Sequence, residues 1–265
     1  MATINVGDSA VDYEQIGTGP SLVLLPTLLA EMSVYDLVIE ELATERRVTR
    51  FNFPGFGAST GPIGETIEDY ANLIVGAMDE LSIPQETDLL ANGFGGFVAG
   101  TMAINHGDRF KKLVLVDTGP GFPEPAKEPV RILARKSVSE GMSSVLDAAI
   151  LRMFPEDFIA DNQKIVEQRK ARLSGTDPNL FANAALSLVK LDNRPKLKDI
   201  DNETLVVVGL ADATTPPELS HELNKGIKGS KLIELPGIGH CPQLQDPSQF
   251  LQAVKPFLGY SKLSG

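Results

Sequence analysis

The chain has 265 residues, enough to build one large hydrophobic core or a core with an insert. Hydrophobic residues make up 42% of the sequence, as in ordinary globular proteins, and no apolar run is long enough to cross a bilayer. The net charge of −11, spread over interspersed acidic and basic residues, disfavours nucleic acids and anionic membranes as partners.

Short apolar runs alternate with amphipathic segments along most of the chain, a pattern that predicts an α/β protein with a mostly parallel sheet. The helical segments of this core are residues 66–81, with Thr66 and Asp69 as an N-terminal cap, and residues 97–106. The runs that predict buried strands are residues 21–26, 47–52, 88–92, 112–117, 204–209 and 231–235.

The strand pattern is interrupted between Asp117 and Ile200. Helical periodicity dominates from about residue 130 to 191, and glycine and proline breaks flank this stretch. We therefore predict a core formed by residues 1–120 and 196–265, with a helical cap of residues 121–195 inserted between two core strands.

A sharp turn between a strand and a helix is predicted at residues 91–96, Ala-Asn-Gly-Phe-Gly-Gly. A nucleophile elbow has the pattern small-x-Ser-x-Gly, because its central residue lies at positive φ and its neighbours pack closely. Here Gly93 occupies the position of the serine and carries no hydroxyl. It is either a plain turn glycine or a replaced nucleophile, by design or by divergence. Restoring serine would give an ordinary elbow, and we expect vacant space above Gly93.

Two further chemical groups follow predicted strands. Asp212 lies on the loop after residues 204–209, and His240 lies on the loop after residues 231–235. The chain order of nucleophile position, acid and histidine is typical of an α/β-hydrolase. Asp117 also ends a core strand and is a second, weaker candidate for the acid.

The remaining histidines and the cysteine give no sign of a metal site. His106 and His221 lie in helical stretches far from His240, so we predict surface positions for both and neither a metal nor a cofactor. Cys241 is the single cysteine, and we interpret it as a packing residue rather than a nucleophile. With no possible disulfide within the chain and no secretory pattern at the N-terminus, we expect a cytoplasmic protein.

Over nearly its full length the chain resembles the α/β-hydrolase superfamily, and within it the 3-oxoadipate enol-lactonases. The closer likeness lies in residues 23–36, 66–69, 140–148 and 204–217. The resemblance implies an α/β-hydrolase fold with the following site residues: Asp212 as the acid, His240 as the general base, Gly93 at the nucleophile position, and the backbone N–H groups of Leu28 and Phe94 as the oxyanion hole.

Two departures from the enol-lactonases occur in one turn. Residues 53–55, Phe-Pro-Gly, lack the arginine that those enzymes tend to carry before the glycine, and Asn52 replaces the usual aspartate. Losing the arginine weakens the case for a substrate carboxylate held at this turn.

The sequence thus predicts a hydrolase that acts on a carboxylic ester or lactone of a small molecule and is inactive or impaired because of Gly93. Thr27, Met142 and Phe154 are the candidate substrate-binding residues. Three alternatives stay open: a carbon–carbon bond hydrolase with the same triad, a cofactor-independent lyase that depends on His240, and a non-catalytic small-molecule receptor. The oligomeric state is open as well, and a homodimer is compatible with the sequence.

Overall fold

The computed structural model describes residues 2–261 and contains one eight-stranded sheet with the order β1-β2-β4-β3-β5-β6-β7-β8. The strands, in chain order, are β1 (Ala2–Val6), β2 (Ser9–Ile16), β3 (Ser21–Leu25), β4 (Arg47–Phe51), β5 (Asp88–Asn92), β6 (Lys112–Val116), β7 (Glu203–Gly209) and β8 (Lys231–Leu235). All pairs from β4 to β8 are parallel, whereas β2 pairs antiparallel with both β1 and β4. The mostly parallel α/β architecture expected from the sequence is confirmed.

The six predicted strands are all present, and β1 and β2 are additional. Every residue of β3 and β5 is buried, which explains the continuous apolar runs that predicted them. β1 forms one edge of the sheet, where most of its residues are exposed or half-buried. It therefore has no apolar run by which the sequence could reveal it.

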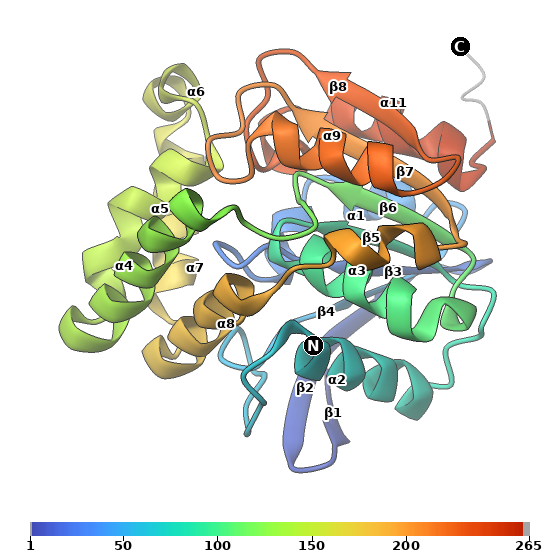
Figure 1. Ribbon diagram of the computed structural model, residues 1–265, viewed down its shortest axis with the longest axis horizontal. Coiled ribbons are helices and arrows are strands. Elements are labelled where there is room, and N and C mark those ends of the chain that lie inside the picture. Colours follow the sequence, from blue (N-terminus) through green and yellow to red (C-terminus); the bar gives the residue numbers. More distant parts are fainter. Residues whose placement is uncertain (1, 262–265) are drawn as a thin grey trace.

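Helices cover the sheet, and Figure 1 shows α2, α3 and α9 in front of it. Thr66 and Asp69 form the predicted cap of α2 as a reciprocal capping box. The helices of the core are α1 (Ile39–Leu42), α2 (Ile67–Glu80), α3 (Phe94–His106), α9 (Pro217–Gly226), α10 (Pro242–Gln245) and α11 (Pro247–Leu258).

A second group of helices lies between β6 and β7 in the chain and stands beside the core in Figure 1. Its members are α4 (Glu124–Glu140), α5 (Leu146–Met153), α6 (Glu156–Asp161), α7 (Gln163–Ser174) and α8 (Pro178–Lys190). We call residues 124–190 the cap. They fall within the predicted insert of residues 121–195, and the treatment of this insert as a separate domain stays a prediction.

Two hydrogen bonds connect the end of α5 to loops of the core. The hydroxyl of Thr214, after β7, donates to the Arg152 carbonyl at 2.7 Å. The backbone N–H of His240, after β8, donates to the Met153 carbonyl at 3.1 Å. The position of the cap is therefore linked directly to the two loops on which the acid and the histidine lie.

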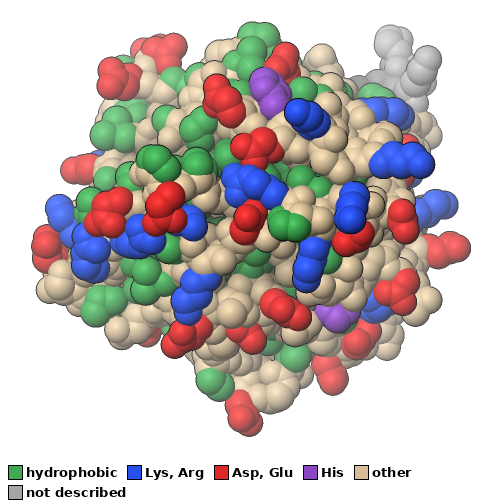
Figure 2. Space-filling view, in the orientation of Figure 1, with side chains coloured by type: hydrophobic (Ala, Val, Ile, Leu, Met, Phe, Trp, Pro, Cys, Tyr) green, Lys and Arg blue, Asp and Glu red, His purple; other side chains and the backbone are tan. Residues whose placement is uncertain are grey.

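Acidic and basic side chains alternate over the face shown in Figure 2, in agreement with their interspersed order in the sequence. Between residues 2 and 261, no helix combines the length and the apolar character needed to span a membrane. Location and partners stay predictions.

Candidate active site

The turn between β5 and α3 forms a tight elbow. Gly93 lies at φ +54° and ψ −117°, a backbone conformation that residues other than glycine rarely adopt. The N–H of Gly95 donates to the Pro26 carbonyl at 2.9 Å, and a Cβ atom at Gly95 would lie 2.6 Å from the Leu25 carbonyl oxygen. The loop after β3 therefore crosses directly over the elbow, and glycine is needed where the two backbones meet.

Asp212 and His240 form a buried pair at the ends of neighbouring strands. His240 Nδ1 lies 2.9 Å from Asp212 Oδ2, and both side chains are at most 1% exposed. The other Asp212 oxygen accepts from the N–H groups of Thr214, at 2.7 Å, and Thr215, at 3.1 Å. The Thr215 hydroxyl donates to Oδ2 at 2.6 Å. With Nδ1–H donating to Asp212 Oδ2, Nε2 of His240 is left as an acceptor.

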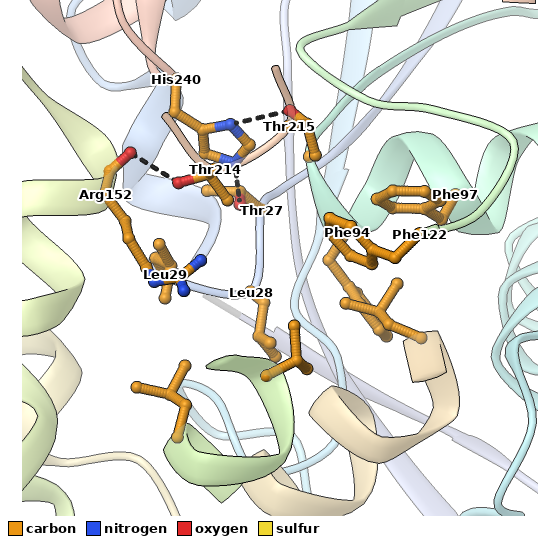
Figure 3. Close-up of a pocket in the computed structure, with 14 residues that line it drawn as sticks. Thr27, Leu28, Leu29, Phe94, Phe97, Phe122, Arg152, Thr214, Thr215 and His240 are labelled. Carbon is orange, nitrogen blue, oxygen red and sulfur yellow. Dashed lines mark hydrogen bonds between the residues drawn. The ribbon is translucent and has the colours of Figure 1, made fainter. Parts of the chain in front are cut away.

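The Thr27 hydroxyl is the group that faces this acceptor. Its Oγ1 lies 3.0 Å from His240 Nε2, and the contact is drawn in Figure 3. A Cβ atom built on Gly93 would overlap Thr27 Oγ1 and lie 2.6 Å from His240 Nε2 and 2.7 Å from Thr27 Cβ. Gly93 and His240 line the same pocket, but the part of the expected space that lies directly above Gly93 is occupied. The Thr27 side chain fills it because the loop after β3 passes so close to the elbow.

The backbone N–H groups of Leu28 and Phe94 are suited to stabilise a negative charge. Phe94 is the first residue of α3, where an N–H has no partner within the helix. Neither its N–H nor that of Leu28 has a hydrogen-bond acceptor within the described part of the chain. Both residues line the same pocket as His240. They are thus available as an oxyanion hole at a helix N-terminus.

The pocket is small and mainly apolar, with a cavity volume of about 40 Å³. Figure 3 shows Phe94, Phe97 and Phe122 on the side away from Arg152. The lining residues are Thr27, Leu28, Leu29, Gly93, Phe94, Phe97, Phe122, Val130, Leu133, Arg152, Leu188, Thr214, Thr215 and His240.

Of the three candidate substrate-binding residues, Thr27 alone belongs to this lining. Met142 is buried in the short 3-10 helix before α5. The Phe154 ring packs against Phe158 with 4.8 Å between the ring centroids. Both side chains are buried in the hydrophobic core, and neither lines this pocket, because the cap helices need apolar contacts of their own.

Sequence reasoning missed Arg152, the cation of the pocket. It lies near the end of α5, and none of the ion pairs found among residues 2–261 includes it. Burial lowers the pKa of its guanidinium, and the nearby charge of Asp212 partly offsets that change. A single arginine in an amphipathic helix gives no sequence signal, since the packing of the cap decides whether it faces solvent or the pocket.

Asn92 is a second residue that sequence reasoning missed, and it positions His240. Its Nδ2 donates to the carbonyl oxygens of Val116, at 3.2 Å, and His240, at 3.0 Å. Its Oδ1 accepts from Gln243 Nε2 at 3.0 Å. The residue before the elbow therefore connects the elbow to the histidine loop.

Neither Asp117 nor Cys241 takes the place of a triad residue. Asp117 accepts from the Gly209 N–H at 2.7 Å, and it is Asp212 that bonds to His240. Burial first, and the charge of Asp212 second, raise the pKa of Asp117 well above its ordinary value. Burial likewise raises the pKa of the Cys241 thiol well above its usual range, which disfavours the reactive thiolate.

The turn that departs from the enol-lactonase pattern is structural. The Phe53 ring packs edge-on against Phe94, with 4.9 Å between centroids. Asn52 accepts from the Met32 N–H at 2.7 Å and donates to Asp12 at 2.9 Å. No cation reaches the pocket from this turn, and Arg152 supplies one from the opposite side, on the cap.

The parallel sheet, the tight elbow after β5 and the acid and histidine after β7 and β8 together define an α/β-hydrolase. The family model described as alpha/beta hydrolase fold matches residues 20–247, and the chain belongs to this family.

Among curated proteins, the chain is 26% identical to 3-oxoadipate enol-lactonase 2 of Acinetobacter baylyi over 256 residues, which cover 96% of this chain and 94% of that protein. It is 28% identical to the pimeloyl-(acyl-carrier protein) methyl ester esterase of Aeromonas hydrophila, over 94% of this chain and all of that one.

Comparison with solved structures also gives an enol-lactonase and an esterase as similar proteins. The enol-lactonase from Burkholderia xenovorans superposes with a TM-score of 0.90 at 25% identity, covering 97% of this chain and 99% of that one. A thermophilic esterase from Thermogutta terrifontis superposes with a TM-score of 0.90 at 26% identity, covering 97% and 98%. The α/β-hydrolase fold and the resemblance to enol-lactonases, both expected from the sequence, are confirmed.

Proposed function

We propose that this protein hydrolyses carboxylic esters or lactones of small molecules. The observation that carries the proposal is the buried His240–Asp212 pair, 2.9 Å apart, with Nε2 of His240 directed toward a pocket. In this function, His240 takes a proton from the attacking oxygen and returns it to the leaving alcohol, while Asp212 keeps the ring in the required tautomer.

The donors at the pocket wall support acyl transfer in particular. The free N–H groups of Leu28 and Phe94 suit the negative oxygen that develops when a carbonyl is attacked. The names of the relatives support the same chemistry, since they include an enol-lactonase and a methyl ester esterase.

The pocket also limits the substrate. One water molecule needs roughly 10–15 Å³ of such a cavity, so about 40 Å³ accommodates a short acyl group while the cap stays in place. A longer acyl chain exceeds this volume. We therefore expect acetyl esters and small lactones to be cleaved faster than esters of longer chains.

The test is a panel of p-nitrophenyl acetate, butyrate and octanoate with γ- and δ-lactones, assayed with the wild type and His240→Ala. We expect cleavage that falls by ~10²–10⁴-fold in His240→Ala, the usual contribution of a general base. His106→Ala is the matched control, because His106 contacts Asn72 at 2.8 Å, away from the site, and should leave the rate unchanged.

A wild type that cleaves no member of the panel would contradict the proposal.

The lyase is the second candidate function, favoured by the missing hydroxyl at Gly93 and by the Thr27 hydroxyl beside His240. It would be supported by a carbon–carbon cleavage that is lost in His240→Ala and occurs without consumption of water. A receptor would show thermal stabilisation by a ligand that is recovered unchanged.

A further inference from the structure

The hydroxyl nearest to His240 comes from the loop after β3, not from the elbow. Thr27 is 2% exposed, and His240 Nε2 is the partner found for its hydroxyl among residues 2–261. Thr27 Oγ1 also occupies the space into which a side chain at Gly93 would extend. The elbow therefore has no hydroxyl at Gly93. The Thr27 hydroxyl occupies that space and makes the hydrogen bond to His240.

We propose that the Thr27 hydroxyl is the nucleophile of this site, a role that rests on the proposed hydrolysis. Three observations carry it together: the 3.0 Å contact between Oγ1 and Nε2, the support of that ring by Asp212, and the presence of Thr27 in the pocket wall. Threonine is among the residues that serve as activated nucleophiles when a base adjoins them.

The reaction proceeds in two balanced halves. Thr27 Oγ1 bonds to the acyl carbon as its proton passes to His240 Nε2, and the ester C–O bond breaks while that proton goes to the departing alcohol oxygen. A water molecule then gives its proton to Nε2 and bonds to the acyl carbon. The bond from Oγ1 to the acyl carbon breaks, and the proton returns from Nε2 to Oγ1. The net products are one acid and one alcohol.

Direct attack by water is disfavoured by the same contact. A water molecule activated by His240 would need the lone pair of Nε2, and the Thr27 hydroxyl holds that position. The N–H groups of Leu28 and Phe94 lie in the wall of the same pocket, where they can serve a carbonyl attacked by Thr27. Whereas the sequence predicts an enzyme impaired by Gly93, this proposal predicts turnover.

The test compares Thr27→Val, which removes the hydroxyl and keeps the shape, with Thr27→Ser, which keeps the hydroxyl. For the panel ester cleaved fastest, we expect kcat to fall on the order of 100-fold or more in Thr27→Val and to stay within about tenfold in Thr27→Ser. Thr101→Val is the matched control. Its buried hydroxyl contacts Phe97 and Asn193, outside the catalytic machinery, so its kcat should match the wild type.

A second readout is independent of ester turnover. The full-length protein is incubated with an alkyl fluorophosphonate and digested, and fragment ions locate the adduct. We expect one phosphonyl group on Thr27, formed as fluoride leaves, and none in Thr27→Val. Thermal melts of the variants show whether each is folded before it is compared.

The outcomes separate the two proposals. If Thr27→Val is folded and keeps the activity that His240→Ala loses, Thr27 is not the nucleophile, although the hydrolase function stands. If the wild type cleaves no ester but Thr27 is phosphonylated, the nucleophile is supported and the substrate class is wrong. If there is neither turnover nor an adduct on Thr27, both proposals are overturned.

Discussion

Replacing Gly93 with serine tests whether Thr27 has taken over the space of the elbow side chain. The new Cβ atom would overlap Thr27 Oγ1 and lie 2.6 Å from His240 Nε2, closer than such contacts normally come. Overpacking costs about 1–3 kcal/mol, and a side chain at φ +54° costs another ~1–3 kcal/mol. We therefore expect Gly93→Ser to lower Tm by roughly 4–24 °C, given ~2–4 °C per kcal/mol for a chain of this size.

The activity of the same variant gives a sharper result in two backgrounds. With Thr27 present, we expect Gly93→Ser to lower kcat/KM at least tenfold, since the overlap displaces the hydroxyl from His240. In a Thr27→Gly background the overlap with Thr27 is gone, so Gly93→Ser should raise kcat/KM at least tenfold. Ester cleavage and thermal melts of the four proteins form a double-mutant cycle. A gain from Gly93→Ser alone, without loss of Tm, would refute the reasoning.

Three other features give testable expectations. Because the pKa of Asp117 is raised in the folded state, the contribution of this carboxyl to the stability of the folded protein falls as pH rises above about 4. Asp117→Asn should thus raise Tm at pH 8, by an amount that vanishes near pH 4, and equal Tm differences at every pH would contradict this. Arg152→Gln should raise KM about tenfold or more for an ester with a free carboxylate and leave a neutral analogue unchanged, because a hydrogen bond to a charged group contributes ~1.5–3 kcal/mol. Equal changes for both substrates would argue against a carboxylate contact. Cys241 should resist a thiol reagent at pH 8 in the folded protein and react once in denaturant; rapid labelling of the native state would show that it is accessible.

The sequence predicted those parts of the fold that depend on local patterns. Buried strands such as β5 are continuous apolar runs because both faces of the sheet are covered, and α2 begins directly after its N-cap, Thr66, because the cap is formed within four residues. The elbow around Gly93 was recognised from its small residues for the same reason, since close backbone packing excludes side chains there.

The parts that the sequence did not predict depend on contacts between distant segments. Thr27 and His240 are 213 positions apart, and their hydrogen bond follows from the path of one loop over the elbow. Arg152 faces the pocket through the packing of the cap, and β1 pairs at an exposed sheet edge. None of these three arrangements can be predicted from the local periodicity of the sequence.

The catalytic pair is tested most directly by Asp212→Asn. An amide at this position has the same shape, but its NH₂ group facing His240 would require Nδ1 to accept, so that Nε2 carries the proton and cannot take one from Thr27. We expect kcat for the panel ester to fall by ~10³–10⁴-fold, with KM and Tm close to those of the wild type. A folded Asp212→Asn variant with wild-type kcat would contradict the assignment of Asp212 and His240 as the working pair.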